Sequence, residues 1–387
     1  MANENERKNA LDMIYLSGCV LNRKKPDINR ISQMDLDSLY KMCKFHSLTA
    51  IVCSALELSG TETSAKWKEA KAKSIKKNML LDCQRQDLFR FMDKKHIWHM
   101  PMKGIILKDL YPQLGMRQMS DNDILYDISF RKEVREYFVD QGYDIKSFGK
   151  LKDDVFQKPP VYNFEMHVAL FGQEDNTMPN SSQLMNYYKN VKDRLIRDSN
   201  DNFLYHFSDE DFYIYFILHA YKHYDIAGTG IRSLIDAYLL LKYKSKSLDM
   251  EYVSSEIKSL GVSEFEYVLR SLSMKIFDDP QCSLSETESK MLNQFIDSGT
   301  YGTIDICARN KRKKYIDNTG NTGKAGYVLR RIFPHMETYK ASFPFFYKHK
   351  ILLPVGWFCR LVRAVLQKNR RVKWLVEIRT SARDDNN

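Results

Sequence analysis

The chain has 387 residues and a formal net charge of +11, with 43% hydrophobic and 12% aromatic side chains. These proportions indicate a globular protein of two or three domains and exclude an intrinsically disordered chain. The seven cysteines are scattered without a C-x-x-C pair. That pattern predicts free thiols in a reducing compartment and excludes a cysteine zinc site of the usual spacing.

The ends of the chain bear on its location and partners. The polar N-terminus lacks the apolar core of a signal peptide, and the apolar stretch at residues 351–359 is too short to cross a bilayer. We therefore expect a cytoplasmic protein without a transmembrane segment. The excess of positive charge lies in residues 301–387, which suit nucleic acid, an anionic membrane surface, or simply a solvated basic surface.

Apolar residues at helical spacing predict an N-terminal helical region over residues 1–95, in which the lysine-rich run 66–77 is a solvated helix face. Residues 96–172 differ: short apolar stretches predict strands near 97–103, 120–127, 143–148 and 161–170, with helices over 105–110 and 130–141. Helical periodicity returns over residues 173–310, and a basic extension follows over 311–387. The predicted fold class is α+β, a small mixed sheet flanked by an N-terminal and a larger C-terminal helical region.

Two carboxylates, Asp121 and Asp123, stand two residues apart in a predicted strand. This spacing points both side chains to one face, where they repel each other unless a cation lies between them. A metal ion is one reason for such a pair. An ordinary loop or helix start is the alternative.

A third carboxylate, Glu165, lies in a strand of strict alternation. Tyr162, Phe164 and Met166 would be buried on one face, and Glu165 and His167 would share the other. The alternative is a half-exposed strand whose polar side faces water.

Further polar residues surround these acids in the sequence. Lys103 and Gly104 precede a predicted helix start, which is typical of a phosphate-binding turn, and no Walker motif is present. His219 and His223 share a helix face. Because no Glu follows His219, packing or hydrogen bonding is favoured over zinc binding.

Arg232 and Asp236 also lie one helical turn apart, most simply as an ion pair within a helix.

Taken in order, these motifs resemble the uncharacterised nucleotidyltransferase family of the DNA polymerase β-like superfamily. The matching residues are Lys103-Gly104, Tyr111-Pro112, Arg117 with Ser120-Asp121-Asn122-Asp123, Gly142-Tyr143, Glu165-Met166-His167, the pair His219 and His223, the stretch from Gly230 to Asp236, residues 298–302 and Phe333-Pro334. The resemblance covers roughly residues 35–365. It departs from the superfamily at Lys103-Gly104, where a Gly-Ser pair is usual, and at Asn122, where an apolar residue is usual.

The resemblance implies a reaction and a site. Asp121, Asp123 and Glu165 would bind two Mg²⁺ ions, with Mn²⁺ as a substitute, and would carry the catalysis. Lys103, Gly104, Arg117 and Ser120 would contact the nucleotide, and His167, His219, His223, Arg232 and Asp236 would surround them. A nucleoside monophosphate would pass from an NTP to an unidentified acceptor (protein, RNA or small molecule), with release of pyrophosphate. A catalytically silent nucleotide-binding protein, or an adaptor that binds polyanions through its basic tail, are the alternatives.

Overall fold

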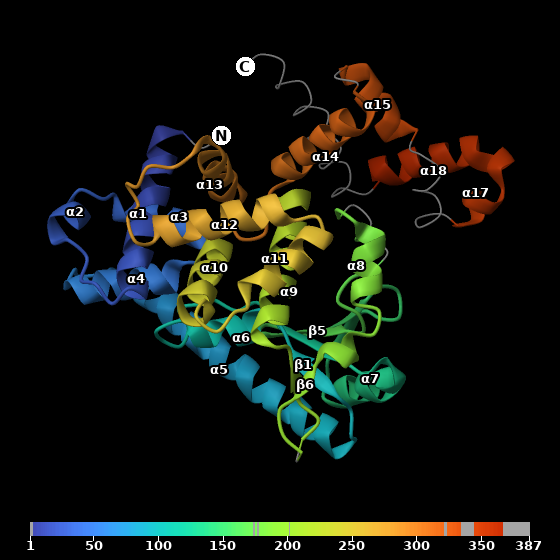
Figure 1. Ribbon diagram of the computed structural model, residues 1–387, viewed down its shortest axis with the longest axis horizontal. Helices are drawn as coiled ribbons and strands as arrows, with labels where there is room; N and C mark the ends of the chain where they lie inside the picture. Colours follow the sequence, from blue (N-terminus) through green and yellow to red (C-terminus); the bar gives the residue numbers. More distant parts are fainter. Residues whose placement is uncertain are drawn as a thin grey trace. The chain divides into compact units, whose positions relative to one another are not determined.

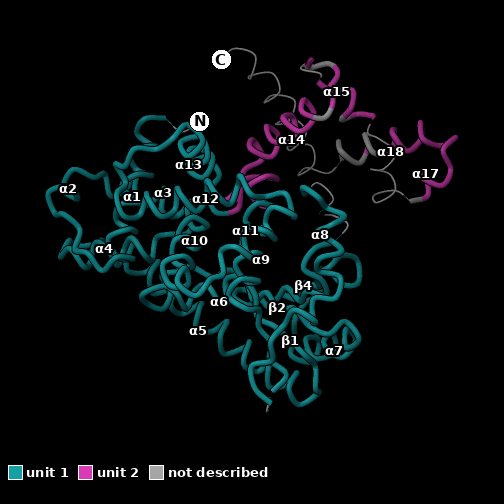
Figure 2. The backbone as a smooth tube through the Cα atoms, viewed as in Figure 1, with its two compact units in different colours: residues 1–222, 230–300 teal, residues 223–229, 301–387 magenta. Residues whose placement is uncertain are grey.

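The computed structural model describes residues 3–172, 175, 178–200, 202–320, 323–333 and 344–366. Pro334 and the basic segment 367–387, which enter the predictions above, lie outside the described residues. The chain forms two compact units, residues 1–222 with 230–300 and residues 223–229 with 301–387 (Figure 2). All the candidate site residues except His223 belong to the first unit. The division into four regions at residues 95, 172 and 310 stays a prediction.

Five helices form the N-terminal part of the first unit, as predicted. They are α1 (Glu4–Leu21), α2 (Ile28–Ser32), α3 (Leu36–Phe45), α4 (Thr49–Ser59) and α5 (Ala65–Lys94). The first turn of α1 is closed by a capping box between Asn3 and Glu6, which satisfies two backbone N–H groups that the helix leaves free. The 30-residue helix α5 runs along the sheet (Figure 1), and its Leu81, Leu88 and Met92 belong to the same buried cluster as Ile124 and Phe164 of the strands.

A five-stranded mixed sheet lies in the middle of the chain, and its presence confirms the α+β fold class. Its elements are β1 (His99–Pro101), α6 (Gly104–Leu107), η1 (Lys108–Leu110), β2 (Asn122–Tyr126), η2 (Ile128–Phe130), α7 (Arg131–Asp140), β3 (Asp144–Ser147), β4 (Asp153–Lys158) and β5 (Tyr162–His167). The strand order is β1-β2-β5-β4-β3. Strands β2 and β5 are parallel, and the other neighbours are antiparallel.

Strand β4 was not predicted from the sequence. Its first residues, Asp153 and Asp154, look like a polar loop. Asp154 is nevertheless fully buried, because Arg131 donates two hydrogen bonds of 2.7 Å to its carboxylate. A paired carboxylate can occupy a core position that the hydrophobic pattern alone would deny it.

The alternation predicted for β5 is confirmed. Phe164 and Met166 belong to a buried cluster with Leu81 and Leu88 of α5 and Phe138 of α7. Helices α5 and α7 therefore cover one face of the sheet. The opposite side of β5 presents the polar residues that form the candidate site.

The remaining helices follow the sheet. The first unit continues with α8 (Ser181–Tyr187), η4 (Val191–Arg194), the short pair β6 (Ile196–Arg197) and β7 (Tyr205–His206), α9 (Asp209–Ile226), α10 (Ile231–Lys244), α11 (Met250–Ser259), α12 (Ser263–Ile276) and α13 (Glu286–Ser298). The last four residues of α9 belong to the second unit, which also holds α14 (Ile304–Thr319), α15 (Lys324–Ile332), α17 (Pro344–Lys348), η5 (Lys350–Leu352) and α18 (Leu353–Leu366). Within the described parts of the chain, no helix combines the length and apolarity needed to span a bilayer.

Candidate functional site

The pairing of β2 with β5 brings two of the predicted acids together. Asp123 lies directly opposite Glu165 in the parallel register. His167 lies two residues further along β5, on the same face, and Asp153 lies opposite it on β4. Sequence reasoning missed Asp153 because it missed the strand.

One oxygen of Asp123 is the centre of the site. Its Oδ1 accepts a hydrogen bond from Lys103 Nζ at 2.8 Å, and His167 Nε2 lies 2.8 Å from the same atom. Glu165 Oε2 lies 3.9 Å from His167 Nε2. The other ring nitrogen of His167, Nδ1, is buried, with no hydrogen-bond partner among the residues that the structure describes.

The charges in this cluster shift one another's ionisation. Burial alone would raise the pKa of Asp123, but Lys103 and His167 outweigh it and bring the pKa below its usual value. Burial alone would lower the pKa of Lys103, because it disfavours the charged ammonium group. Asp123 and its neighbours outweigh burial and raise the pKa of that lysine. Burial, and then the Lys103 charge, lower the pKa of His167, so the imidazole is neutral at pH 7.

The pKa of Glu165 is shifted in the opposite direction to that of Asp123. Burial, and next the charges of Asp123 and Asp121, raise its pKa to about 8. Tyr215 of α9 lies near Lys103, Asp123 and Glu165, and burial raises its pKa as well. Periodicity gave no signal for Tyr215, because a buried aromatic in a helix looks like any core residue.

Asp121 stands one residue before β2. Burial, and then Asp123, raise its pKa, while Lys103, Ser120 and Arg232 act in the other direction. Lys77 of α5 also interacts with Asp121, and burial lowers the pKa of this lysine. The predicted solvated face of residues 66–77 is therefore wrong at Lys77, which is half-buried beside the acids.

Arg117 is placed differently from the phosphate contact that the resemblance implies. Its Nε and Nη2 donate to the two oxygens of Asp236 at 2.9 and 2.8 Å, and the Tyr111 hydroxyl donates to the same carboxylate at 2.8 Å. All three side chains are buried. The simple prediction of an ion pair between Arg232 and Asp236 missed this arrangement, because the partner of Asp236 comes from a loop 119 residues away.

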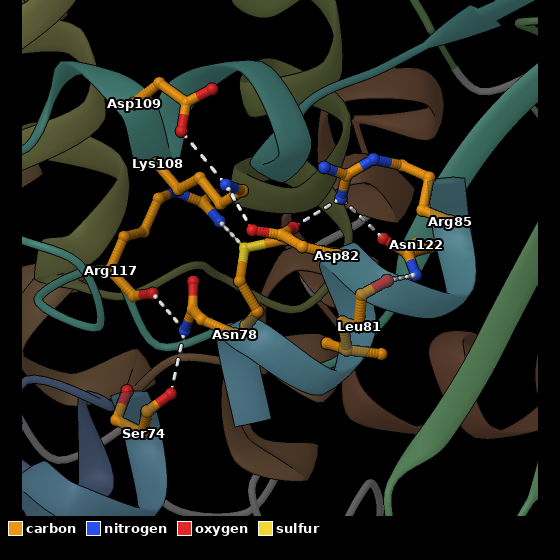
Figure 3. A network of polar contacts seen from close by, with 10 residues as sticks. Ser74, Asn78, Leu81, Asp82, Arg85, Lys108, Asp109, Arg117 and Asn122 are labelled. Carbon is orange, nitrogen blue, oxygen red and sulfur yellow. Dashed lines mark hydrogen bonds and ion pairs between the residues drawn. The ribbon is translucent and has the colours of Figure 1, made fainter. Parts of the chain in front are cut away.

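The segment that leads into β2 is held at several backbone atoms. Ser74 and Asn78 of α5 donate to the carbonyls of Gly115 and Arg117 at 2.7 and 3.3 Å, and Figure 3 shows the second of these bonds. Arg232 donates to the carbonyl of Gln118 at 3.0 Å. These contacts fix the path of the chain immediately before Asp121.

Asn122 is a further contact between this part of the chain and α5. Its side chain is fully buried, donates to the Leu81 carbonyl at 3.0 Å, and accepts from Arg85 at 3.2 Å (Figure 3). The residue between the two aspartates therefore ties β2 to α5 by hydrogen bonds. An apolar residue there could only pack against the helix.

The Lys103-Gly104 turn has two separate constraints. Lys103 has φ +48° and ψ −115°, a backbone conformation that is strained for a residue with a side chain. Gly104 begins the four-residue helix α6, and a Cβ added to it would lie 2.5 Å from Arg117 Nη1. The glycine is therefore required for the close approach of Arg117.

The two histidines of α9 differ in their exposure. The His219 ring lies 6.0 Å from the ring of Tyr215, which in turn neighbours Lys103. His223 is exposed. Their predicted role around the site stays a prediction.

The donor atoms can be tested for a metal ion. One ligand atom each from Asp123, Glu165 and His167 lie within 4.8 Å of one another, the only such group of three within the described ranges. Two carboxylates and one imidazole fit a divalent cation. Asp121 lies outside this group but close enough to influence both acids.

Comparison with known families identifies one match. Residues 32–278 match the model of a family described as uncharacterised nucleotidyltransferase. The matched range contains every residue of the acid cluster and the Arg117–Asp236 pair. No curated protein and no solved structure matches the chain.

Proposed function

The chain belongs to the uncharacterised nucleotidyltransferase family, and on that basis we propose that it transfers a nucleoside monophosphate from an NTP to an acceptor. The acceptor oxygen would form a bond to the α-phosphorus, and the bond from that phosphorus to the β-phosphate oxygen would break, releasing pyrophosphate. The observation that carries the proposal is the pairing of Asp123 with Glu165 on adjacent parallel strands, with the Lys103 ammonium group hydrogen-bonded to Asp123.

Asp121, Asp123 and Glu165 would hold the divalent ions, Mg²⁺ or Mn²⁺. Carboxylate oxygens are the protein ligands that these ions prefer. When bound, the ions supply positive charge to the α-phosphate and to the departing pyrophosphate. The family name and the grouped ligand atoms of Asp123, Glu165 and His167 support this assignment.

Of the two acids paired across β2 and β5, Glu165 is better placed than Asp123 to receive the acceptor's proton. Its side chain is 30% exposed, whereas that of Asp123 is 9% exposed. Asp123 Oδ1 is also already engaged by Lys103 and His167. An acceptor hydroxyl approaching from solvent would therefore meet Glu165 first.

Three cations are placed to meet the triphosphate. Lys103 donates a hydrogen bond to Asp123, and Lys77 and Arg232 both interact electrostatically with Asp121. Phosphate oxygens bound beside the acids would lie within reach of these side chains. Arg117 would act indirectly, because its pairing with Asp236 holds the segment before Asp121.

Labelling tests the proposal. The full chain would be incubated with Mg²⁺ or Mn²⁺, each α-³²P NTP, and either cell protein, RNA or small-molecule extract. We expect one acceptor pool to be labelled, and Asp123→Asn or Glu165→Gln to abolish the label. Asp109→Asn removes an exposed carboxylate that is paired with Lys108, and it should label as the wild type does.

The outcome also separates the alternatives. Nucleotide binding without label from any NTP or pool would identify a catalytically silent member of the family. Label that is equal in wild type and both acid variants would refute the assignment of the site.

A further inference from the structure

Lys103 already supplies a positive charge to the carboxylates that the proposed function assigns to metal ions. Its Nζ lies 2.8 Å from Asp123 Oδ1, and its charge also interacts with Glu165 and Asp121. The lysine side chain is 18% exposed and the aspartate 9%. An ammonium group held this way occupies a position next to three acids, where a divalent ion would also be attracted.

The oxygens of Asp123 limit how many cations can bind at once. A carboxylate oxygen has two lone pairs, and those of Oδ1 are directed to Lys103 and His167, each at 2.8 Å. Only Oδ2 is then available to a metal ion. Oδ1 could accept an ion only by giving up one of these two contacts, so the Lys103 contact leaves Asp123 with one free oxygen instead of two.

The backbone at Lys103 indicates that this placement is specific. A residue other than glycine at φ +48° and ψ −115° is strained, and strain of this kind persists only where the surroundings enforce it. A Cβ on Gly104, the next residue, would lie 2.5 Å from Arg117 Nη1, so a side chain there would force the arginine to move. The turn is therefore constrained at the ammonium-bearing residue and at the residue that follows it.

We propose that Lys103 fills one of the two cation positions of the acid cluster in the nucleotide-free protein, so that the cluster takes one divalent ion and not two. This inference rests on the proposed function, since it concerns the same acids. A triphosphate bound beside the cluster would compete with Asp123 for the lysine. Transfer of the ammonium group to a phosphate oxygen would free Oδ1, so a second ion would enter together with the nucleotide.

Counting Mn²⁺ tests the proposal without measuring activity. Free Mn²⁺ would be followed by electron paramagnetic resonance during titration of the nucleotide-free full chain. We expect one ion per wild-type chain, and two ions, or one bound at least tenfold more tightly, in Lys103→Met. Lys103→Arg keeps the charge and should bind one ion.

A matched control is available five residues further on. Lys108 is more deeply buried than Lys103, at 7% against 18% exposed, but it pairs with Asp82 and Asp109 and not with the acid cluster. Lys108→Met should bind Mn²⁺ as the wild type does. Circular dichroism of each variant verifies the fold, and if Lys103→Met is unfolded, Lys103→Gln takes its place.

The failures of the two proposals can be told apart. Two ions in the nucleotide-free wild type, or the same count and affinity in wild type and Lys103→Met, would overturn the role of Lys103 and leave the metal site standing. No Mn²⁺ bound by the wild type or any Lys103 variant would overturn the metal site itself.

Discussion

The buried pair of Arg117 and Asp236 allows a direct choice between a structural and a phosphate-binding role for the arginine. Their side chains are 9% and 5% exposed, and two hydrogen bonds of 2.9 and 2.8 Å join them. Arg117→Met would leave the Asp236 carboxylate buried without its cation. We expect this variant to lose about 3–5 kcal/mol of unfolding free energy, as is typical when one partner of a buried ion pair is removed.

The double substitution gives a sharper result. Asp236→Asn alone would leave the Arg117 guanidinium buried without a counter-charge, at a similar cost in unfolding free energy. The amide oxygen of the asparagine could still accept the hydrogen bond from the Tyr111 hydroxyl. In Arg117→Met/Asp236→Asn no buried charge is left unpaired, so the double variant should cost at least about 2 kcal/mol less than the sum of the two single variants. Urea unfolding followed by circular dichroism and tryptophan fluorescence measures these values, and Trp67 is buried in the same unit.

An exposed pair on α5 provides the control. Arg90 is ion-paired with Asp87 at the surface, and Arg90→Met should change the unfolding free energy by only about 0–1 kcal/mol. If Arg117→Met unfolds at the wild-type urea concentration and instead weakens triphosphate binding, the structural role is wrong. Strictly additive effects of Arg117→Met and Asp236→Asn would also refute the coupling.

Three further outcomes are expected. Asn122→Leu removes the hydrogen bonds to α5, including a charge-assisted one from Arg85. It should lower the unfolding free energy measured in urea by about 1–3 kcal/mol. Unchanged stability would show that packing alone holds β2 against α5. Gly104→Ala places a Cβ against Arg117 and should cost about 1–3 kcal/mol, read as a lower thermal midpoint, whereas a wild-type midpoint would contradict the close approach. The pKa of Glu165 is raised from 4.5 to about 8 in the folded state. Between these two pH values the metal-free folded state therefore binds more protons than the unfolded state. The unfolding free energy should fall as pH rises from 4.5 to about 8. Glu165→Gln should flatten that fall in urea titrations at fixed pH, and an equally steep fall in the variant would exclude Glu165 as its source.

Local patterns were enough to predict much of the core. Alternation in residues 161–170 correctly separated the buried Phe164 and Met166 from the polar side with Glu165 and His167. That prediction works because side chains alternate across a strand whatever the rest of the chain does. The order of the short motifs likewise led to the family that the comparison confirms.

Contacts between distant segments could not be predicted in this way. Arg232 and Asp236 have ideal spacing for a pair within α10, yet Arg117 and Tyr111 reach Asp236 from the loop before β2. Strand β4 was missed because Asp154 looks exposed until Arg131 is placed beside it. In each case a partner far away in the sequence decides the environment of the residue, and periodicity carries no information about such a partner.

The parallel pairing of β2 and β5 has a consequence for how this protein can vary. Asp123 and Glu165 are held opposite each other by the hydrogen bonds of two adjacent strands, so their separation is a property of the backbone. The chain between them makes an excursion through α7, β3 and β4 before it returns. Turns in that excursion can lengthen or change sequence without altering the distance between the two acids. Variation in length and sequence among relatives of this chain should therefore concentrate in those turns, while the spacing of the two acids stays constant.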